Sequence, residues 1–351
     1  MRPMYRHCRV ICTRPTGNDF SLAFPEQFVA AYVLPLHIFY YMRPVISVNQ
    51  LSKQFKDLHA VNDLSFTVNE GDVYGFLGQN GAGKSTTIRM LLTLIRPTSG
   101  DIHIFDQDLS KHRSEILQQV GAVIEKPDLY KYLSAFDNLA LFAKLSGVST
   151  KRSVLMEKLQ MVGLEQRADS KVKTYSQGMK QRLGIAVALV HDPKLILLDE
   201  PTNGLDPQGI ADMRNLILRL SRELGKTVLV SSHLLSEIEL IANRMLIIHK
   251  GKKMVEGAVA ELLDPARSLV RIQSTDDAAT RNKLMQSSWA GMVQNDSAEL
   301  KLKMNKAEVP KLIEDLVQIN VQLLSVDAAH SLEDYFLSLT TRPGHVEPFA
   351  N

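Results

Sequence analysis

The sequence predicts an α/β fold built around a largely parallel β-sheet. From residue 43 onward, short runs rich in β-branched and apolar residues alternate with segments of helical period, the pattern of strands joined by crossover helices. A glycine-rich stretch, Gly78–Ser85, separates one such strand from one such helix. The run Leu195–Asp199 is apolar up to its last residue, as is typical of a central parallel strand buried on both faces.

Seven segments of this core are predicted as strands from their apolar, β-rich composition. They are residues 45–48, 64–68, 73–77, 120–124, 194–199, 227–232 and 244–249. A helix is predicted from about Lys84 to Leu94, directly after the glycine-rich stretch. Between about residues 129 and 190 the periods are mainly helical, which predicts a helical subdomain inserted between strands of the core.

The pattern of apolar and polar residues changes again after Pro265. Alternating residues predict half-exposed strands, and one stretch between them has helical spacing. These segments are 269–273, 298–304, 306–318 and 321–326. We expect a main domain over residues 43–265, a small accessory α/β module over 266–341, and a tail over 342–351.

The bulk composition is that of an ordinary globular protein. Of the 351 residues, 45% are apolar and 23% are charged, and the formal net charge is only +3. This near balance argues against a polyelectrolyte partner such as DNA, which would normally require a clustered basic face. The two cysteines are Cys8 and Cys12. With His7 they could belong to a metal site, but no second ligand pair follows at zinc-like spacing, so a reduced protein without disulfides is favoured.

The segment Phe28–Tyr41 is the one stretch that raises the question of a membrane. It is apolar and aromatic but contains Pro35 and His37, and it is shorter than the roughly 20 residues that a spanning helix needs. The sequence around it also lacks the small-residue cleavage site of a signal peptide. We therefore expect residues 1–41 to be an extension outside the folded unit, with Met42 as a candidate start. A membrane-contacting extension is the alternative.

A phosphate-binding loop is predicted at residues 78–85, where GQNGAGKS fits the pattern G-x-x-x-x-G-K-[S/T]. Glycines let the backbone wrap around phosphates with its N–H groups pointing inward, and the following helix adds the positive end of its dipole. Lys84 would neutralise the β- and γ-phosphates, and the Ser85 hydroxyl would bind magnesium. Because the stretch lies between a predicted strand and a predicted helix, it has the context that such a loop requires.

An acidic pair, Asp199 and Glu200, follows the buried strand 194–199. Ligands collect at the carboxyl ends of strands in open α/β sheets. Asp199 would hold magnesium there, directly or through water, and Glu200 would orient or deprotonate an attacking water. Alone, such a pair would more often cap a turn. Together with the glycine-rich loop, it predicts the second half of a phosphate site.

A third motif gives the chain a resemblance to the ATP-binding cassette (ABC) family. Residues 175–182 read YSQGMKQR, which is similar to the signature sequence of that family. The resemblance implies a helix that caps the γ-phosphate held by the other subunit of a dimer, through the Ser176 hydroxyl and the Gly178 N–H. Gln177 and Met179 replace the commoner glycine and glutamine. This form resembles the branch that serves antibiotic, lipid and polysaccharide exporters.

Three further positions agree with the resemblance, which covers about residues 45–260. Gly204–Pro207 is similar to the loop that links the two active sites across the dimer. His233, after the strand 227–232, resembles the switch histidine that contacts the γ-phosphate, although a lone histidine is more often structural. Phe55 resembles the aromatic residue that stacks on adenine, although by itself it could equally belong to the core.

One position departs from the family pattern. After the strand 120–124 the family usually has a glutamine that touches magnesium and signals to the helical subdomain, whereas this chain has Glu125. Relatives of the bacitracin-resistance type often share the glutamate. A carboxylate can still bind magnesium, but it adds negative charge beside the γ-phosphate.

The resemblance implies an ATPase that uses ATP and Mg²⁺, forms a homodimer or pairs with another ATPase subunit, and drives transport through integral membrane permease subunits. Such a subunit would be cytoplasmic and peripheral on the inner face of the membrane. The alternative is a soluble ABC ATPase that acts on ribosomes or nucleic acid, but those relatives usually carry two cassettes or a long coiled-coil insertion. An importer subunit is a third option, less favoured by the signature form. Residues 330–340 resemble the closing helix of exporter-type subunits.

The predicted site has three sets of residues. The catalytic set is Lys84, Glu200 and His233. The metal-binding set is Ser85, Glu125 and Asp199. The nucleotide-binding set is Phe55, Gly78, Gln79, Asn80, Gly81, Ala82, Gly83, Lys84, Ser85, Thr86, Glu125, Ser176, Gly178 and Asp206.

Overall fold

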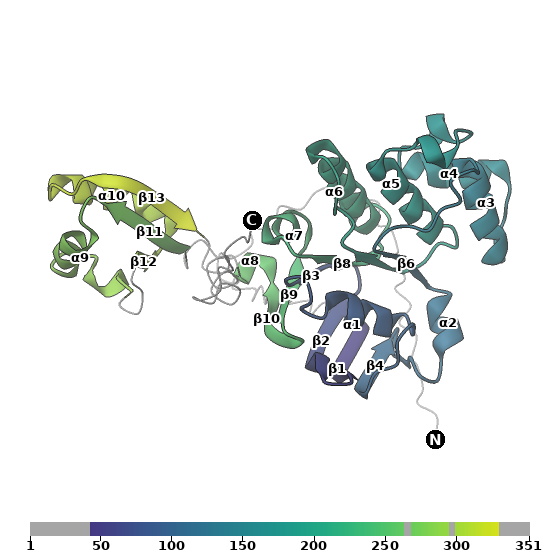
Figure 1. Cartoon of the computed structure of the whole chain (residues 1–351), viewed down its shortest axis with the longest axis horizontal. Coiled ribbons are helices and arrows are strands. Elements are labelled where there is room, and N and C mark those ends of the chain that lie inside the picture. Colours follow the sequence, from purple (N-terminus) through teal and green to yellow (C-terminus); the bar gives the residue numbers. More distant parts are fainter. Residues whose placement is uncertain (1–42, 263–267, 295–298, 330–351) are drawn as a thin grey trace, which may run out of the picture. The chain divides into compact units, whose positions relative to one another are not determined.

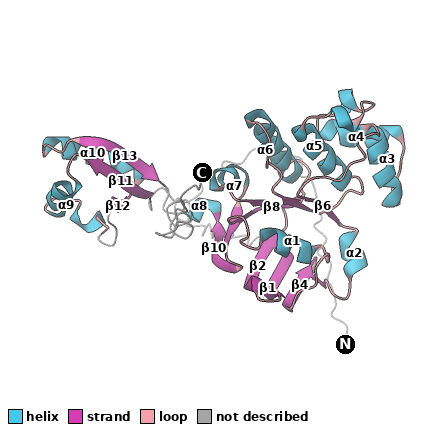
Figure 2. Ribbon diagram, viewed as in Figure 1, coloured by secondary structure: helices cyan, strands magenta, loops and turns pink. Residues whose placement is uncertain are grey.

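A computed structural model of the chain describes residues 43–262, 268–294 and 299–329. The expected extension over residues 1–41, the closing helix and the tail over 342–351 lie outside these described residues. In the described part, helices and strands alternate along the chain (Figures 1 and 2). No helix there has the length and apolar character to cross a bilayer.

The central sheet has six strands in the order β10-β9-β3-β8-β7-β6. Its members are β3 (Val73–Leu77), β6 (Val120–Ile124), β7 (Leu195–Asp199), β8 (Thr227–Ser232), β9 (Arg244–His249) and β10 (Lys252–Ala258). The neighbouring strands from β9 to β6 in this order pair in parallel, and β10 pairs antiparallel with β9. The register places Asp199 beside Ile124 and Ser231, and Leu77 beside Ser232. The carboxyl ends of the parallel strands therefore meet along one edge, directly before the predicted site residues.

A second, antiparallel sheet has the order β2-β1-β4-β5. It contains β1 (Pro44–Phe55), β2 (Leu58–Asn69), β4 (Ser99–Ile104) and β5 (Gln107–Asp108), and α2 (Arg113–Leu117) follows it. The predicted strands 45–48 and 64–68 are parts of β1 and β2. Strand β4 was not predicted, and its first half (SGD) is polar and exposed.

Two hydrophobic clusters cover the two faces of the central sheet. Along β7, Leu195 and Leu197 belong to one cluster, and Ile196 and Leu198 belong to the other, as expected for side chains that alternate between faces. The helices that follow strands of the core are α1 (Lys84–Leu91), α6 (Pro207–Arg222), α7 (Leu235–Ile241) and α8 (Val259–Leu262). Helix α1 packs in the cluster shared with the antiparallel sheet, and α6 packs in the other.

The segment between β6 and β7 is helical. It contains α3 (Ala135–Leu145), α4 (Arg152–Met161), α5 (Gln177–Ala188) and the 3₁₀ turns Glu165–Arg167 and Val172–Thr174. Helix α3 begins with a capping box, in which the Ser134 side chain accepts a hydrogen bond from Asp137 N and the Asp137 carboxylate accepts one from Ser134 N. Buried residues from all three helices join the cluster on the α6 side of the sheet.

A separate small module has a three-stranded antiparallel sheet in the order β12-β11-β13. Its elements are β11 (Ser268–Ser274), α9 (Asp277–Met285), the 3₁₀ turn Ala290–Met292, β12 (Leu300–Met304), the 3₁₀ turn Lys306–Glu308, α10 (Val309–Gln318) and β13 (Leu323–Ala329). Val293 also forms an isolated antiparallel bridge with Leu302. This chain order is that of a β-α-β-β-α-β module whose second strand is reduced to one bridge. The module has its own hydrophobic cluster.

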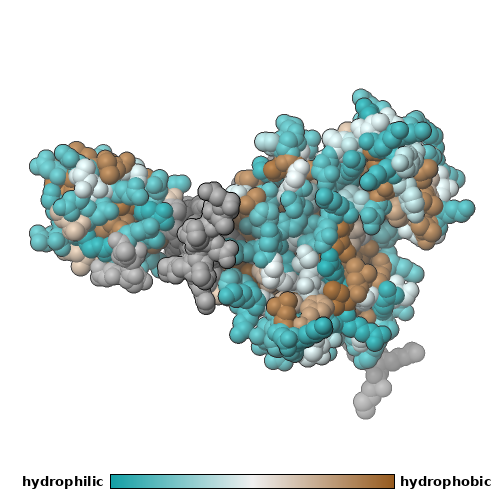
Figure 3. All heavy atoms as spheres, viewed as in Figure 1, coloured by the Kyte–Doolittle hydropathy of each residue, from teal (hydrophilic) through white to brown (hydrophobic). Residues whose placement is uncertain are grey.

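Together these elements confirm the predicted fold class: a mainly parallel α/β core, an antiparallel β subdomain, an inserted helical subdomain and a small α/β module. The visible face of the core is mostly hydrophilic, with apolar residues gathered toward its centre (Figure 3). Some boundaries differ: the helix predicted over Lys84–Leu94 ends at Leu91, and β1 and β2 are longer than predicted.

Candidate active site

The glycine-rich loop lies between β3 and α1, and steric contacts explain two of its glycines. A Cβ at Gly83 would lie 2.5 Å from the Ala60 carbonyl oxygen, and Gly83 has a φ of +110°. A Cβ at Gly78 would lie 2.7 Å from the Ile248 carbonyl oxygen. Only glycine allows the loop to approach β2 and β9 this closely. The loop is therefore held in place by the strands on both sides of it.

Helix α1 opens toward this loop without a capping side chain or an acidic residue in its first turn. Among the described residues, no group accepts a hydrogen bond from the N–H of Lys84, Ser85 or Thr86. Such unpartnered N–H groups at a helix start favour an anion. The loop thus has the features of a phosphate cradle.

Lys84 lies almost completely buried within the loop. Its Nζ donates to the Gly78 carbonyl oxygen at 2.6 Å and lies 3.0 Å from Glu200 Oε1. The lysine is 5% exposed and the glutamate 15%. The structure therefore brings together the lysine of the first motif and the glutamate of the second.

His233 completes a chain of contacts with these two residues. Its Nδ1 lies 2.7 Å from Glu200 Oε2, and because a carboxylate only accepts, the proton of this hydrogen bond resides on Nδ1. The Nε2 atom is left available for another partner. The two oxygens of Glu200 thus contact the lysine and the histidine separately.

Asp199 and Glu200 are both held by Ser231, a residue whose role the sequence analysis missed. Ser231 Oγ donates to Asp199 Oδ1 at 2.6 Å and accepts from Glu200 N at 2.9 Å. Glu200 has a φ of +50°, a conformation that costs a non-glycine residue about 1–3 kcal/mol. This turn directs the Glu200 side chain toward Lys84, immediately after β7 ends.

Asp199 has one buried carboxylate oxygen left over. While Oδ1 is bonded to Ser231, no hydrogen-bond partner within the described residues reaches Oδ2. A buried oxygen of this kind is costly unless a ligand or water satisfies it. No cluster of three or more His, Cys, Asp or Glu side chains in the described part could hold a metal by itself. The Cys8 and Cys12 pair lies outside that part.

Glu125 contacts two different helices at the end of β6. Its carboxylate forms an ion pair with Arg89 of α1, and its carbonyl oxygen accepts a hydrogen bond of 3.3 Å from Gln181 of α5. Glu125 also has a positive φ, +56°. The residue therefore links the phosphate-loop helix to the helical subdomain, and the sequence analysis did not predict either partner.

Ser176, Gly178 and Asp206 lie apart from this cluster. Ser176 Oγ accepts from Met179 N at 3.2 Å and caps α5, and Asp206 Oδ1 accepts from Gly209 N at 3.0 Å and caps α6. None of the three has a hydrogen bond or ion pair with residues 78–86 in the described structure. They belong to helix starts that are partly or fully exposed.

Phe55 lies at the turn of the β1–β2 hairpin, paired with Leu58. Its side chain is exposed, and Lys53 Nζ lies 4.9 Å from the centroid of its ring. The same hairpin carries Ala60, whose carbonyl oxygen lies against Gly83. An exposed aromatic ring is thus attached to the strand that contacts the phosphate loop.

Comparison with known proteins explains this arrangement. Residues 61–203 match the family model described as ABC transporter. The chain is 42% identical to the uncharacterized ABC transporter ATP-binding protein YhcH of Bacillus subtilis, over 85% of this chain and 97% of that protein. It is 41% identical to the bacitracin transport ATP-binding protein BcrA of Bacillus licheniformis, over 85% of this chain and 98% of that protein. The chain belongs to the ABC transporter family.

A solved structure supports the same assignment. The ATP-binding cassette MJ0796, in a dimeric post-hydrolysis state bound to ADP and Pi, superimposes with a TM-score of 0.55 at 26% identity, covering 61% of this chain and 98% of that one. The resemblance stated from the sequence motifs is therefore confirmed, and this ABC protein is an ATPase.

Proposed function

We propose that this ABC ATPase is the energy-coupling subunit of an exporter, and that two copies enclose two Mg-ATP while separate membrane subunits form the transport path. The observation that carries the proposal is the contact chain from Lys84 through Glu200 to His233, at the carboxyl ends of parallel strands. A lysine, a base and a histidine in direct contact beside a phosphate cradle are the parts that γ-phosphate hydrolysis requires.

The residues at the strand ends fit a magnesium ion. Asp199 Oδ2 is buried and lacks a partner among the described residues, and the Ser85 hydroxyl has no hydrogen bond there either. Hard oxygen ligands of this kind suit Mg²⁺, which usually keeps several waters and binds one or two protein groups plus phosphates. When bound, the ion neutralises charge on the β- and γ-phosphates. Glu125 is the third candidate ligand.

In hydrolysis, Glu200 would take a proton from the water that attacks the γ-phosphorus. The new P–O bond forms as the bond to the β–γ bridging oxygen breaks, and ADP leaves with that oxygen. His233 would hold the Glu200 carboxylate through Nδ1–H, or contact the γ-phosphate through its other nitrogen. As ATP enters, the Lys84 ammonium group would leave Glu200 and form an ion pair with the phosphates.

A second copy would complete each site. In one chain, Ser176 and Gly178 lie at the start of α5 without a hydrogen bond to the phosphate loop in the described structure. The hydroxyl and backbone N–H at this helix start would suit a γ-phosphate held by the partner subunit. Asp206 in the neighbouring loop would connect the two sites, and Phe55 would stack on adenine.

The relatives and the signature motif support a membrane partner and the direction of transport. YhcH and BcrA are named as ABC transporter and bacitracin transport ATP-binding proteins, which supports a transporter over an ATPase of ribosomes or nucleic acid. The YSQGMKQR form of the signature supports export. We place the subunit on the inner face of the membrane, attached through its permease.

The Glu200→Gln variant of the full chain tests this function. With Mg-ATP we expect ATP binding to persist, hydrolysis to be nearly abolished and a stable dimer to accumulate, because the γ-phosphate is retained. Size-exclusion chromatography with light scattering measures the dimer, and phosphate release measures turnover. Chelation of magnesium with EDTA should return the variant to monomer. Normal hydrolysis by this variant would refute the role of Glu200.

A further inference from the structure

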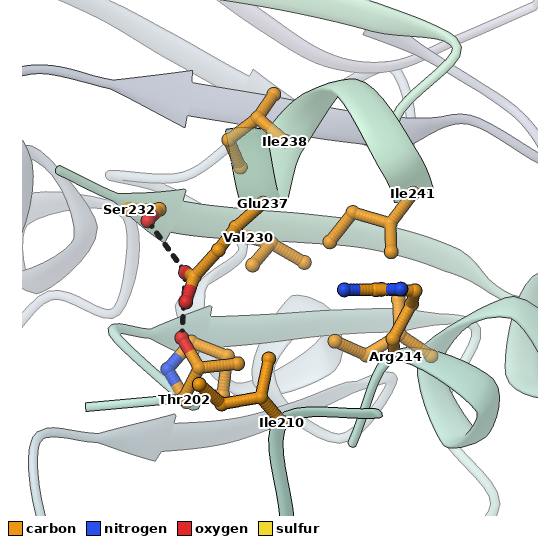
Figure 4. Close-up of a pocket in the computed structure, with 10 residues that line it drawn as sticks. Thr202, Ile210, Arg214, Val230, Ser232, Glu237, Ile238 and Ile241 are labelled. Carbon is orange, nitrogen blue, oxygen red and sulfur yellow. Dashed lines mark hydrogen bonds between the residues drawn. The ribbon is translucent and has the colours of Figure 1, made fainter. Parts of the chain in front are cut away.

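A glutamate outside the predicted site connects the two loops that carry Glu200 and His233. Glu237 lies in the first turn of α7. Its Oε2 accepts one hydrogen bond from Thr202 Oγ1 at 2.7 Å and another from Ser232 Oγ at 2.9 Å. Figure 4 shows this carboxylate between the two hydroxyls. One oxygen therefore joins the loop after β7 to the end of β8.

The two hydroxyl partners are close in sequence to the reacting groups. Thr202 follows Glu200 by two residues, and Ser232 directly precedes His233. Ser232 Oγ also accepts from Leu234 N at 3.0 Å, so that its hydroxyl closes a short turn around His233. Glu237 thus holds the backbone on which both reacting side chains are carried.

Besides the Ser231 hydroxyl, which bonds Asp199 and Glu200 N where the strands end, two hydrogen-bonded links between side chains join the loops. The first link is the Glu200–His233 hydrogen bond, whose partners must change when ATP and water enter the site. The second link, through Glu237, involves no group that the hydrolysis uses. It can therefore persist while the first is broken, and it keeps the loops in register.

The surroundings of Glu237 favour strong hydrogen bonds. A small cavity of about 10 Å³ beside it is lined by Ile210, Ile238 and Ile241, and Figure 4 shows Arg214 on the Ile241 side of this cavity. Glu237 has no ion pair with Arg214 or with another cation within the described residues. Hydroxyl bonds to a carboxylate are shorter and stronger than bonds between neutral groups, and a partly buried site strengthens them further.

We propose that Glu237 is a positioning residue for ATP hydrolysis, which fixes Glu200 and His233 relative to each other by accepting hydrogen bonds from Thr202 and Ser232. The inference rests on the roles proposed for Glu200 and His233. It predicts an effect on turnover rather than on ATP binding, because no hydrogen bond joins Glu237 to the phosphate loop within the described residues. A misplacement of about 1 Å can reduce turnover on the order of 100-fold.

The test compares three substitutions in the full chain. Glu237→Ala removes the acceptor, and we expect kcat to fall about 10- to 100-fold while the KM for ATP stays within about threefold of the parent value. Glu237→Gln keeps the length and one acceptor oxygen, and should retain most of kcat. Glu237→Asp keeps the charge but is one methylene shorter, so it should lose kcat. The matched control is Glu239→Ala, on the same helix and without a hydrogen bond in the described structure, which should leave kcat unchanged.

Thr202→Val is a second route to the same measurement, since it removes one hydroxyl with little change of shape. It should lower kcat, and the Thr202→Val/Glu237→Ala double variant should be no slower than Glu237→Ala alone, because the two residues act through one bond. Thermal unfolding would check that each variant folds. Unchanged kcat in folded Glu237→Ala, or a higher kcat in Glu237→Asp than in Glu237→Gln, would overturn the proposal. If Glu200→Gln hydrolysed ATP normally, the assignment of the site itself would fail instead.

Discussion

Lys84 and Glu200 form an ion pair across the nucleotide site, with Nζ 3.0 Å from Oε1, and both side chains are largely withdrawn from solvent. In this arrangement the lysine that would bind phosphate is neutralised by the residue that would activate water. ATP must therefore compete with Glu200 for Lys84. Binding of the nucleotide would therefore also release the Glu200 carboxylate from Lys84.

This competition predicts that Glu200→Gln binds ATP more tightly than the parent protein. A neutral amide attracts Lys84 less, and a partly screened ion pair contributes about 0.5–1 kcal/mol, which corresponds to a gain of about 2- to 5-fold in affinity. Titration with a non-hydrolysable ATP analogue measures the dissociation constant. Glu239→Gln on α7 is the control, because it makes the same substitution at a glutamate without an ion pair in the described structure. Equal affinities of parent and Glu200→Gln would show that the ion pair does not compete.

The phosphate loop makes a second prediction, based on two glycines with positive φ. Gly83→Ala would place a Cβ 2.5 Å from the Ala60 carbonyl oxygen, whereas Gly81→Ala would meet nothing within 4 Å. Both substitutions strain the backbone by about 1–3 kcal/mol, but only Gly83→Ala also pushes the loop away from β2. We expect a larger fall in melting temperature and a larger loss of ATP affinity for Gly83→Ala. Similar effects of the two would argue against the contact with β2.

The ion pair between Arg89 and Glu125 makes a third prediction. The two side chains are 37% and 64% exposed, so the pair contributes little to stability. We propose that Arg89 offsets the negative charge that Glu125 would bring beside the γ-phosphate. Arg89→Met should therefore raise the KM for Mg-ATP by about 2- to 5-fold, the scale of one uncompensated charge at this exposure.

A double variant separates the charge of Glu125 from the packing of Arg89. In Arg89→Met/Glu125→Gln the uncompensated charge is absent, and the KM should return toward the parent value. Arg222→Met, at the exposed end of α6, is the control for loss of a cation. If the double variant were as impaired as Arg89→Met, the effect would come from packing.

The sequence was sufficient to predict the position in the fold of those candidate site residues that adjoin a strand or helix of clear pattern. Lys84 follows a glycine loop with recognisable spacing, and Asp199 ends an apolar strand whose burial its composition reveals. Their positions on the same sheet edge follow from the parallel topology. The α/β fold class was predictable for the same reason.

The partners of these residues were not predictable from one sequence. Ser231 reaches Asp199 because β7 and β8 pair in a specific register, and Arg89 reaches Glu125 because α1 and β6 lie close together. Both relationships arise in three dimensions and leave no local pattern. Helix α6 is a different case. It was not predicted, although its sequence contains the helical spacing of its buried residues, Met213, Leu216, Ile217 and Leu220.

Gly178 allows the proposed dimer to be tested without damage to the isolated subunit. A Cβ at this position would lie 3.8 Å from Leu205 Cδ2, an ordinary van der Waals contact, and alanine is the better helix former. Gly178→Ala should therefore fold with an unchanged or higher melting temperature. If its N–H and open surface serve the γ-phosphate of the partner subunit, the added methyl group should weaken ATP-dependent dimerisation at least about 10-fold, the scale of one lost charge-assisted hydrogen bond.

Gly184, on the same helix, is the matched control. A Cβ there would lie 2.5 Å from Pro127 Cβ, so Gly184→Ala should lower the melting temperature through a clash within one subunit. In the Glu200→Gln background, light scattering with Mg-ATP would then separate the two effects: Gly178→Ala should be stable but monomeric, and Gly184→Ala should be less stable but dimeric wherever it is folded. If Gly178→Ala were stable and dimerised in the Glu200→Gln background, and if the single Gly178→Ala variant hydrolysed ATP at the parent rate, α5 would not complete the site of a second copy.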